Sequence, residues 1–289
     1  MNTLVWVTYK MKTFISLYQI KKTASHFKTH MGKINIHSLF EKNFKRYRHR
    51  IKETKKIYSV KGNKYSKKRH VLHLNIVNEF MKKASSPGKG EKSIAVLIGG
   101  GTASGKTTVR KKIVENMLNE KNIRACIVDP DEIKDYIPEY ASLKKKHPDD
   151  AARLVHKESV DISDLLVKRL IRYRKHFVYE GTMARTKKYE KLVKTLKKSR
   201  YEVYVYIVDI PLELAKHRAA ERARMTGRMI PAHIIENTHR QVPITFEVIK
   251  NLVDRYYVYD NRNGFVLIAS KYYVNQPLYD EFLKKVETR

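Results

Sequence analysis

The chain has 289 residues, 42% of them hydrophobic, which is enough for one large α/β domain or two small ones. Its single cysteine, Cys126, excludes an internal disulfide and a cysteine zinc cluster, and it favours a reducing, cytoplasmic setting. The net charge is +32, and residues 1–92 hold 23 Lys and Arg against 4 Asp and Glu. This excess fits nucleic acid or an anionic membrane as a partner, and it equally fits a solvated basic surface.

The N-terminal third is basic and weakly patterned. Residues 4–20 are apolar, but Lys10 and Lys12 interrupt them, so we expect neither a transmembrane segment nor a signal peptide. Residues 41–69 are highly charged and carry interleaved aromatic residues. They predict a mobile or partly helical arm, the segment through which nucleic acid would bind.

A helix and a linker lead into the rest of the chain. Apolar residues at helical spacing predict a helix over 66–83, with Ser66 as its N-cap. Residues 85–90 are rich in Ser, Pro and Gly and predict a linker.

Residues 100–107 read G-x-x-x-x-G-K-T, the pattern of a phosphate-binding P-loop. The apolar run 93–98 before the pattern predicts a buried parallel strand, and residues 108–118 after it have helical spacing. A strand, a glycine-rich loop and a helix in this order form the structural context that the motif requires. A glycine-rich turn with an incidental lysine is the competing interpretation.

The residue types of this loop suit a nucleoside triphosphate. Glycines let backbone N–H groups turn inward around phosphate oxygens, and the helix N-terminus adds partial positive charge. Lys106 reaches the β- and γ-phosphates of ATP or GTP, and the Thr107 hydroxyl ligates Mg²⁺. The predicted nucleotide-binding residues are Gly100, Gly101, Thr102, Ala103, Ser104, Gly105, Lys106, Thr107 and Thr108.

Strand and helix patterns alternate through the remaining chain. Strands are predicted at 124–129, 176–180, 201–210, 256–259 and 264–270, and helices at 149–175, 187–199, 211–224, 232–241, 244–254 and 276–286. This alternation predicts an α/β fold with a mostly parallel sheet flanked by helices.

Polar groups follow the predicted strands where ligands bind in open α/β sheets. Asp129 and Asp131 follow the second strand, and Glu180 and Thr182 follow the third. A carboxylate beside a γ-phosphate takes the proton of an attacking hydroxyl, and we assign that role to Asp131. A turn with a helix N-cap explains the same Asp-Pro-Asp sequence.

Phosphoryl transfer also needs cations around the developing charge. Arg218 and Arg222 are four residues apart on one helix face, and Arg228 follows a glycine in a loop that has the character of a lid. Alternatively, all three arginines simply belong to the basic surface of the protein.

The chain resembles the zeta toxin family of P-loop kinases, which includes UDP-N-acetylglucosamine kinases, over residues 65–285. The matching motifs are R-H-V-L-H-L-N-I-V from Arg69, G-G-G-T-A-S-G-K-T-T, D-P-D-E-I-K, H-K-E-S from His156, E-G-T, E-R-A-R-M-T-G-R-M-I-P and Y-D-N from Tyr259. The loop alone is widely shared, whereas the combination is much more specific.

The resemblance implies roles for individual residues. Asp131 would be the base, with Arg222 and Arg228 as charge clamps. Glu180, Thr182 and Asp164 would line the sugar-substrate side, and the family is expected to carry Glu where this chain has Asp164. A separate antitoxin protein would block the nucleotide site. The kinase domain would cover residues 65–289, preceded by a basic extension, residues 1–64. The part of this extension before residue 60 has no recognised counterpart in the family.

Three functions fit these observations. The leading one is a kinase that phosphorylates a nucleotide sugar such as UDP-N-acetylglucosamine, the toxin of a toxin–antitoxin pair. A polynucleotide or nucleoside kinase would use the same loop and base, with the basic arm holding nucleic acid. A non-catalytic nucleotide-binding module would use the P-loop as a switch.

Overall fold

The computed structural model describes residues 51–60, 64–226 and 230–286. Residues 1–50, which include the start of the basic arm 41–69, lie outside the described residues, as does Arg228 of the expected lid. A single compact unit begins at Ile51, and the division of the chain at residue 65 stays a prediction. Within the described ranges, no helix is both long enough and apolar enough to cross a membrane.

The strands and helices of the described part alternate along the chain. The strands are β1 (Ser59–Val60), β2 (Lys64–Tyr65), β3 (Ile94–Gly99), β4 (Cys126–Val128), β5 (Phe177–Glu180), β6 (Glu202–Asp209), β7 (Arg255–Asp260), β8 (Val266–Ser270) and β9 (Tyr273–Val274). The α-helices are α3 (Thr54–Tyr58), α4 (Lys67–Met81), α5 (Lys106–Val109), α6 (Glu115–Glu120), α7 (Pro130–Ile133), α8 (Pro138–Lys146), α9 (Pro148–Arg172), α10 (Thr186–Lys198), α11 (Leu212–Thr226), α12 (Ala232–Ile249) and α13 (Gln276–Lys284).

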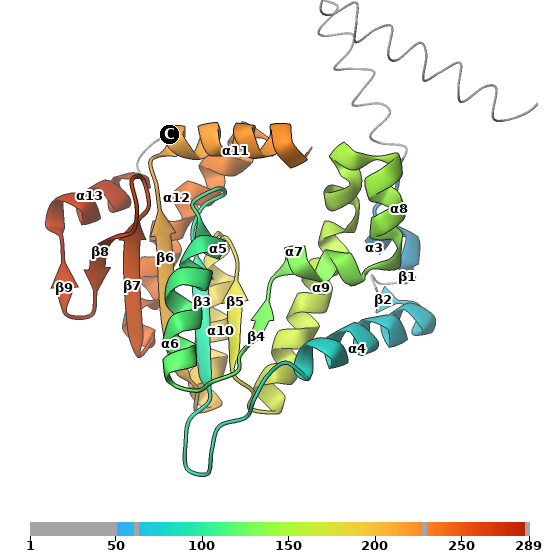
Figure 1. Cartoon of the computed structure of the whole chain (residues 1–289), viewed down its shortest axis with the longest axis horizontal. Helices are drawn as coiled ribbons and strands as arrows, with labels where there is room; N and C mark the ends of the chain where they lie inside the picture. The colour runs from blue at the N-terminus through green and yellow to red at the C-terminus, as the bar shows by residue number, and fades with distance from the viewer. Residues whose placement is uncertain (1–50, 61–63, 227–229, 287–289) are drawn as a thin grey trace, which may run out of the picture. The chain divides into compact units, whose positions relative to one another are not determined.

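A seven-stranded sheet in the order β4-β5-β3-β6-β7-β8-β9 forms the centre of this unit (Figure 1). The five strands from β4 to β7 run parallel, and β8 and β9 continue the sheet antiparallel. The predicted fold class, α/β with a mostly parallel sheet flanked by helices, is therefore confirmed. Strand β3, which leads into the P-loop, lies inside the sheet between β5 and β6.

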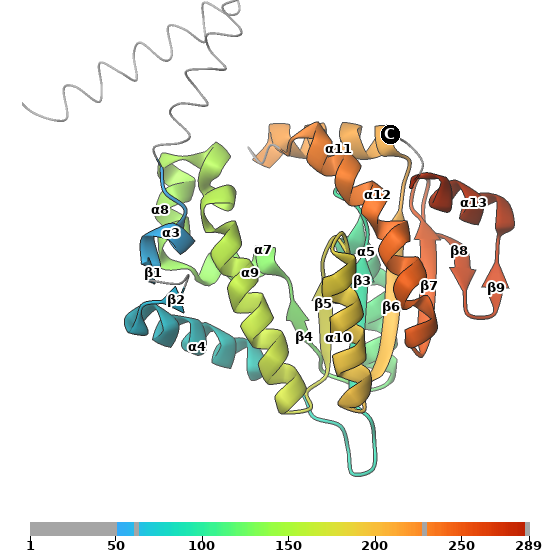
Figure 2. The ribbon, with the colours of Figure 1, turned by 180° about the vertical axis from the view of Figure 1, so that it is seen from behind.

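Helices cover both faces of the sheet. In Figure 1 the P-loop helix α5–α6 lies in front of the strands, and Figure 2 shows α10 and α12 over the opposite face. Successive β3 side chains point to opposite faces: Val96 and Ile98 pack with Leu118 of α6, and Leu97 packs with α10. Because both faces are covered, the strand is apolar without alternation.

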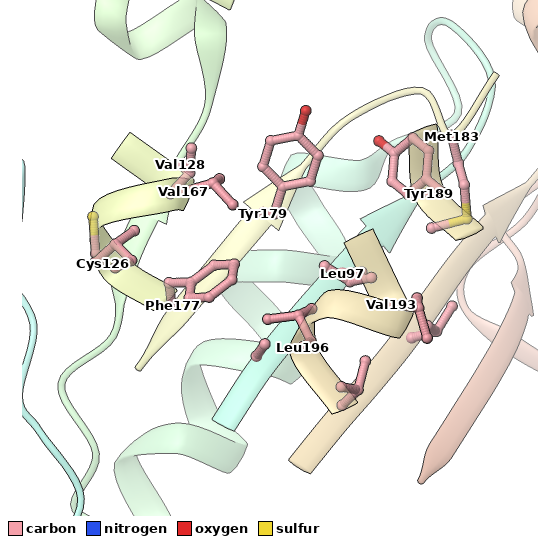
Figure 3. Packing of buried hydrophobic residues seen from close by; sticks show 14 of the residues in the cluster. Leu97, Cys126, Val128, Val167, Phe177, Tyr179, Met183, Tyr189, Val193 and Leu196 are labelled. Atoms are coloured by element: carbon pink, nitrogen blue, oxygen red, sulfur yellow. The ribbon is translucent and has the colours of Figure 1, made fainter. Parts of the chain in front are cut away.

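The larger of these cores joins β3, β4 and β5 to the helices behind them. Figure 3 shows Leu97 of β3 beside Val193 and Leu196 of α10, while Phe177 of β5 lies near Cys126 of β4. All five side chains are fully buried. Shortening Leu97 to alanine would cost about 2–5 kcal/mol, since a cavity would remain between strand and helix.

Helix α4 begins where its sequence predicts. The Ser66 hydroxyl accepts the Arg69 N–H at 3.3 Å, which confirms Ser66 as the N-cap. The preceding residues also contact the domain, because the buried Thr54 of α3 donates to the Leu154 carbonyl of α9 at 3.4 Å.

The prediction of two helices at 232–241 and 244–254 is wrong, because α12 continues through Pro243 to Ile249. A proline lacks the N–H that would bond four residues back, which costs helix stability. Burial of Val242, Pro243 and Phe246 in the core outweighs that cost. Helix α8 was not predicted from the sequence.

Candidate active site

The P-loop connects β3 to α5, as predicted, and two of its glycines are required by sterics. Gly100 and Gly105 have φ of +153° and +97°, where other residues are strained. A Cβ on Gly100 would lie 2.4 Å from the Val208 carbonyl oxygen, and one on Gly105 would lie 2.2 Å from Asn261 Nδ2. Asn261 also donates to the Ser104 carbonyl at 2.8 Å. The late Tyr-Asp-Asn motif therefore holds the loop.

Lys106 and Thr107 begin the helix that follows the loop. The Lys106 ammonium donates to the Gly100 and Gly101 carbonyls at 3.0 and 2.8 Å, so it lies within the loop. Burial lowers the pKa of Lys106 to about 8, although Glu180 and two aspartates oppose this effect. The next residue, Thr107, donates its hydroxyl to Glu180 Oε1 at 2.7 Å.

Helix α12 supports the outer arm of the loop. The Thr102 N–H donates to Thr238 Oγ1 at 3.1 Å, and His239 Nε2 contacts the Thr102 carbonyl at 2.9 Å. A carbonyl only accepts, so Nε2 carries a proton. Burial lowers the pKa of His239 to about 4, which favours the neutral ring. No sequence pattern marks Thr238 or His239, because the contact joins residues 136 and 137 positions apart.

The second strand end carries the predicted base. Asp129 is the N-cap of α7 and accepts the Asp131 N–H at 2.8 Å, as the N-cap interpretation requires. Burial raises the pKa of Asp129 to about 6. Asp131 is 38% exposed and accepts from the buried Lys134 at 2.6 Å. Both aspartates border a cavity at the strand ends, and Asp129 also caps the turn that carries Asp131.

The third strand end meets the P-loop helix. Glu180 accepts from Thr107 with one carboxylate oxygen and from Arg110 Nε with the other, at 2.7 and 3.0 Å. Arg110 was not predicted from the sequence, where it is one of many basic residues. The Glu180 side chain is buried. Its contacts with Thr107 and Arg110 couple the P-loop helix to strand β5.

A cavity of about 720 Å³ lies where these strand ends meet. The predicted site residues that border it are Thr102, Ala103, Gly105, Lys106, Thr107, Asp131, Glu180, Thr182 and Arg222. Gly100, Gly101, Ser104 and Thr108 belong to the loop but do not border the cavity, and Arg228 lies outside the described residues.

The wall opposite the loop is built by α9, α10 and the segment before α10. Asp164 does not border the cavity, and its carboxylate accepts from Lys188 at 2.7 Å. Lys188 borders the cavity in its place, together with Arg185 and His156. The resemblance predicts that the Asp164 carboxylate lines the cavity. In the structure the Lys188 ammonium lines it, and Asp164 forms an ion pair with Lys188.

The site offers oxygen ligands to a magnesium ion. Thr107 Oγ1 and Glu180 Oε1 lie together at the start of α5, and hydroxyl and carboxylate oxygens suit Mg²⁺. Among the described residues, no three His, Cys, Asp or Glu side chains form a metal-binding group. The donor set fits an ion whose remaining ligands are phosphate oxygens and water.

Comparison with known proteins identifies the family of this chain. The zeta toxin family model matches residues 77–272, which include the P-loop, all three strand ends and the lid region. This chain belongs to the zeta toxin family. The resemblance seen in the motifs is thereby confirmed.

Two streptococcal toxins are among the relatives of this chain. Toxin PezT of Streptococcus pneumoniae serotype 4 is 26% identical over 213 residues, which cover 68% of this chain and 81% of that protein. Toxin zeta of Streptococcus pyogenes is 26% identical over 189 residues, covering 62% of this chain and 64% of its own length.

Solved structures share the fold at lower identity. The PezAT chromosomal toxin–antitoxin system of Streptococcus pneumoniae matches with a TM-score of 0.59 and 18% identity, over 76% of this chain and 88% of that one. The AvrRxo1-ORF1:AvrRxo1-ORF2 structure with sulphate ions matches with a TM-score of 0.64 and 19% identity, over 81% of this chain and 83% of that one. At these identities the likeness shows the fold.

Proposed function

We propose that this protein transfers the γ-phosphate of ATP or GTP to a hydroxyl of a nucleotide sugar such as UDP-N-acetylglucosamine. The observation that carries the proposal is one cavity bordered by Lys106, Asp131 and Glu180, from three separate strand ends. Phosphoryl transfer is catalysed mainly by positioning and charge, and this arrangement supplies a phosphate cradle, a base and an acceptor wall.

The donor nucleotide would occupy the P-loop side. Backbone N–H groups at the start of α5 and the Lys106 ammonium would hold its phosphates. An AvrRxo1-ORF1:-ORF2 structure with ATP shares this fold with a TM-score of 0.64, which supports a triphosphate donor. Thr107 and Glu180 would hold Mg²⁺, which when bound neutralises charge on the phosphate oxygens.

Asp131 would remove the proton from the acceptor hydroxyl. It borders the cavity, and its ion pair with Lys134 holds it at the turn. Arg222, and Arg228 outside the described residues, would stabilise the charge that develops on the transferred group.

The acceptor would lie against Glu180, Thr182 and the pair of Lys188 with Asp164. Arg185 and Lys188 border this wall, and cations of this kind bind the diphosphate of a nucleotide sugar well. This wall favours a charged acceptor over a neutral sugar.

The biological role we infer is that of a toxin. The named relatives are toxins, and the PezAT neighbour is a toxin–antitoxin system. A separate antitoxin protein would then restrain the kinase in the cytoplasm, where nucleotide sugars are its substrates.

The proposal is tested by following label from γ-labelled ATP into UDP-N-acetylglucosamine with Mg²⁺. We expect transfer by the wild type, none by Lys106→Ala, and none by Asp131→Asn, which should still bind nucleotide. Turnover by Asp131→Asn would disprove the base assignment. Loss of ATP without a labelled sugar would reject this acceptor and direct the search to nucleosides and RNA ends.

A further inference from the structure

Arg110 is a buried cation shared by three carboxylates. Only 6% of it is exposed. Its Nε donates to Glu180 at 3.0 Å, its Nη1 to Glu115 at 2.8 Å and its Nη2 to Glu132 at 3.1 Å. The planar guanidinium spans three elements at once, namely the end of β5, the P-loop helix and α7, which no lysine could do.

A local widening of the helix makes this arrangement fit. Residues Arg110–Val114 form a π-helical turn, in which the Glu115 N–H bonds to the Arg110 carbonyl five residues back. Glu115 consequently lies above Arg110 and can pair with it. Such turns cost stability and are concentrated at functional sites.

The partners of Arg110 are next to groups that the proposed reaction uses. Glu180 contacts Thr107 through the oxygen that Arg110 leaves free. Glu132 follows Asp131 on the same short helix. Arg110, Glu132 and Glu180 all border the cavity.

We propose that Arg110 is a positioning residue, which orients Glu180 against Thr107 at the metal edge of the P-loop and fixes the turn that carries Asp131. This inference rests on the proposed function and adds to it a residue that acts through Glu180 and Glu132. Without the guanidinium, Glu180 would rotate away from Thr107, and α7 would lose its link to the P-loop helix.

The test separates positioning from simple charge compensation. Arg110→Met, Arg110→Lys and Glu180→Gln are compared with Lys112→Met, which removes an exposed charge from the same helix and does not border the cavity. We expect Arg110→Met to lower kcat for transfer about 100-fold, as misplacement of catalytic groups does. Arg110→Lys should fail to restore kcat, and Lys112→Met should leave it unchanged.

A second readout does not depend on turnover. The affinity for ATP is measured by titration with Mg²⁺ and again with EDTA. Arg110→Met should weaken binding about tenfold with Mg²⁺ and little with EDTA, because it acts through Glu180. Adding Glu180→Gln to Arg110→Met should cause no further loss.

The outcomes distinguish the two proposals. If the wild type binds Mg²⁺ and ATP but transfers phosphate to no acceptor, the proposed function is wrong. The ATP affinities of the Arg110 and Glu180 variants, with Mg²⁺ and with EDTA, still test the positioning role of Arg110. Restoration of kcat and Mg²⁺-dependent affinity by Arg110→Lys would overturn the positioning role. Equal loss of ATP affinity with and without Mg²⁺ would overturn it as well.

Discussion

Two buried arginines organise this protein in different ways. Arg69 and Arg110 are each 6% exposed, and each is held by carboxylates. Arg69 forms bidentate pairs with Glu158 and Glu139 at 2.6–3.0 Å, and its guanidinium stacks 3.8 Å from the Tyr58 ring centroid. It joins α3 and α4 to α8 and α9, whereas Arg110 joins the strand ends around the cavity.

The difference lies in the surroundings of the carboxylates. The Glu158 side chain is 0% exposed. Two of the three carboxylates that hold Arg110, Glu115 and Glu132, are 37% and 43% exposed, and only Glu180, at 7%, is buried. A carboxylate that loses its arginine in a dry core stays charged and uncompensated, but one beside water is rehydrated. The Arg69 cluster should therefore govern stability, and the Arg110 cluster should govern the geometry of the site.

The largest expected effect is on unfolding. Arg69→Met removes a bidentate partner from both Glu158 and Glu139, and we expect a loss of about 3–5 kcal/mol in the free energy of unfolding. Urea denaturation at pH 7 measures it, with the exposed neighbour Lys68→Met as control. Arg110→Met should lower the free energy of unfolding by less than Arg69→Met does. The opposite ranking would invalidate the distinction between the two clusters.

The second-largest expected effect is a loss of folding stability at low pH, through Glu158 in the Arg69 cluster. Burial alone would raise the pKa of Glu158, but hydrogen bonds from His73 and Arg69 outweigh it and lower the pKa to about 2. Glu158 therefore contributes roughly 3 kcal/mol to the free energy of unfolding. This contribution is fully present above pH 4.5 and is lost as the pH falls toward 2. Stability measured from pH 6 to 2.5 should show this slope in the wild type. An equally steep slope in Glu158→Gln would argue against it.

The cavity should instead show a pH dependence of ligand binding. Burial lowers the pKa of Lys106 to about 8 in the free protein. The protonated amine binds phosphate, so affinity for ATP should fall above pH 8, by up to about tenfold per pH unit. Titrations between pH 6.5 and 9.5 measure this. Constant affinity to pH 9.5 would place Lys106 away from the phosphates.

The smallest expected effect concerns the start of α4. Ser66→Ala removes the N-cap of the helix that carries Arg69 and should cost about 1 kcal/mol of stability. Phosphate transfer should not change, since no residue of α4 borders the cavity. A Ser66→Asp control should retain the stability. Reduced kcat in a fully folded Ser66→Ala protein would show that the two clusters are coupled.

The contrast also explains what could be predicted from the sequence. The P-loop, the apolar strand before it and Asp131 are local patterns, so the fold class and the loop geometry follow from short stretches. Arg110 is 70 residues from Glu180, and His239 is 137 residues from Thr102. Such pairs depend on which strands become neighbours, and in so basic a chain neither residue stands out. The helix break predicted at Pro243 is wrong because the missing N–H of a proline is visible in the local sequence. The burial in the core that offsets it depends on the tertiary structure.

Phosphorus-31 NMR of ATP and UDP-N-acetylglucosamine incubated with the protein and Mg²⁺ detects the transferred phosphate itself. We expect one new phosphomonoester signal on the sugar for each ADP formed. Formation of ADP with inorganic phosphate alone, or no ADP at all, would contradict phosphate transfer to this acceptor.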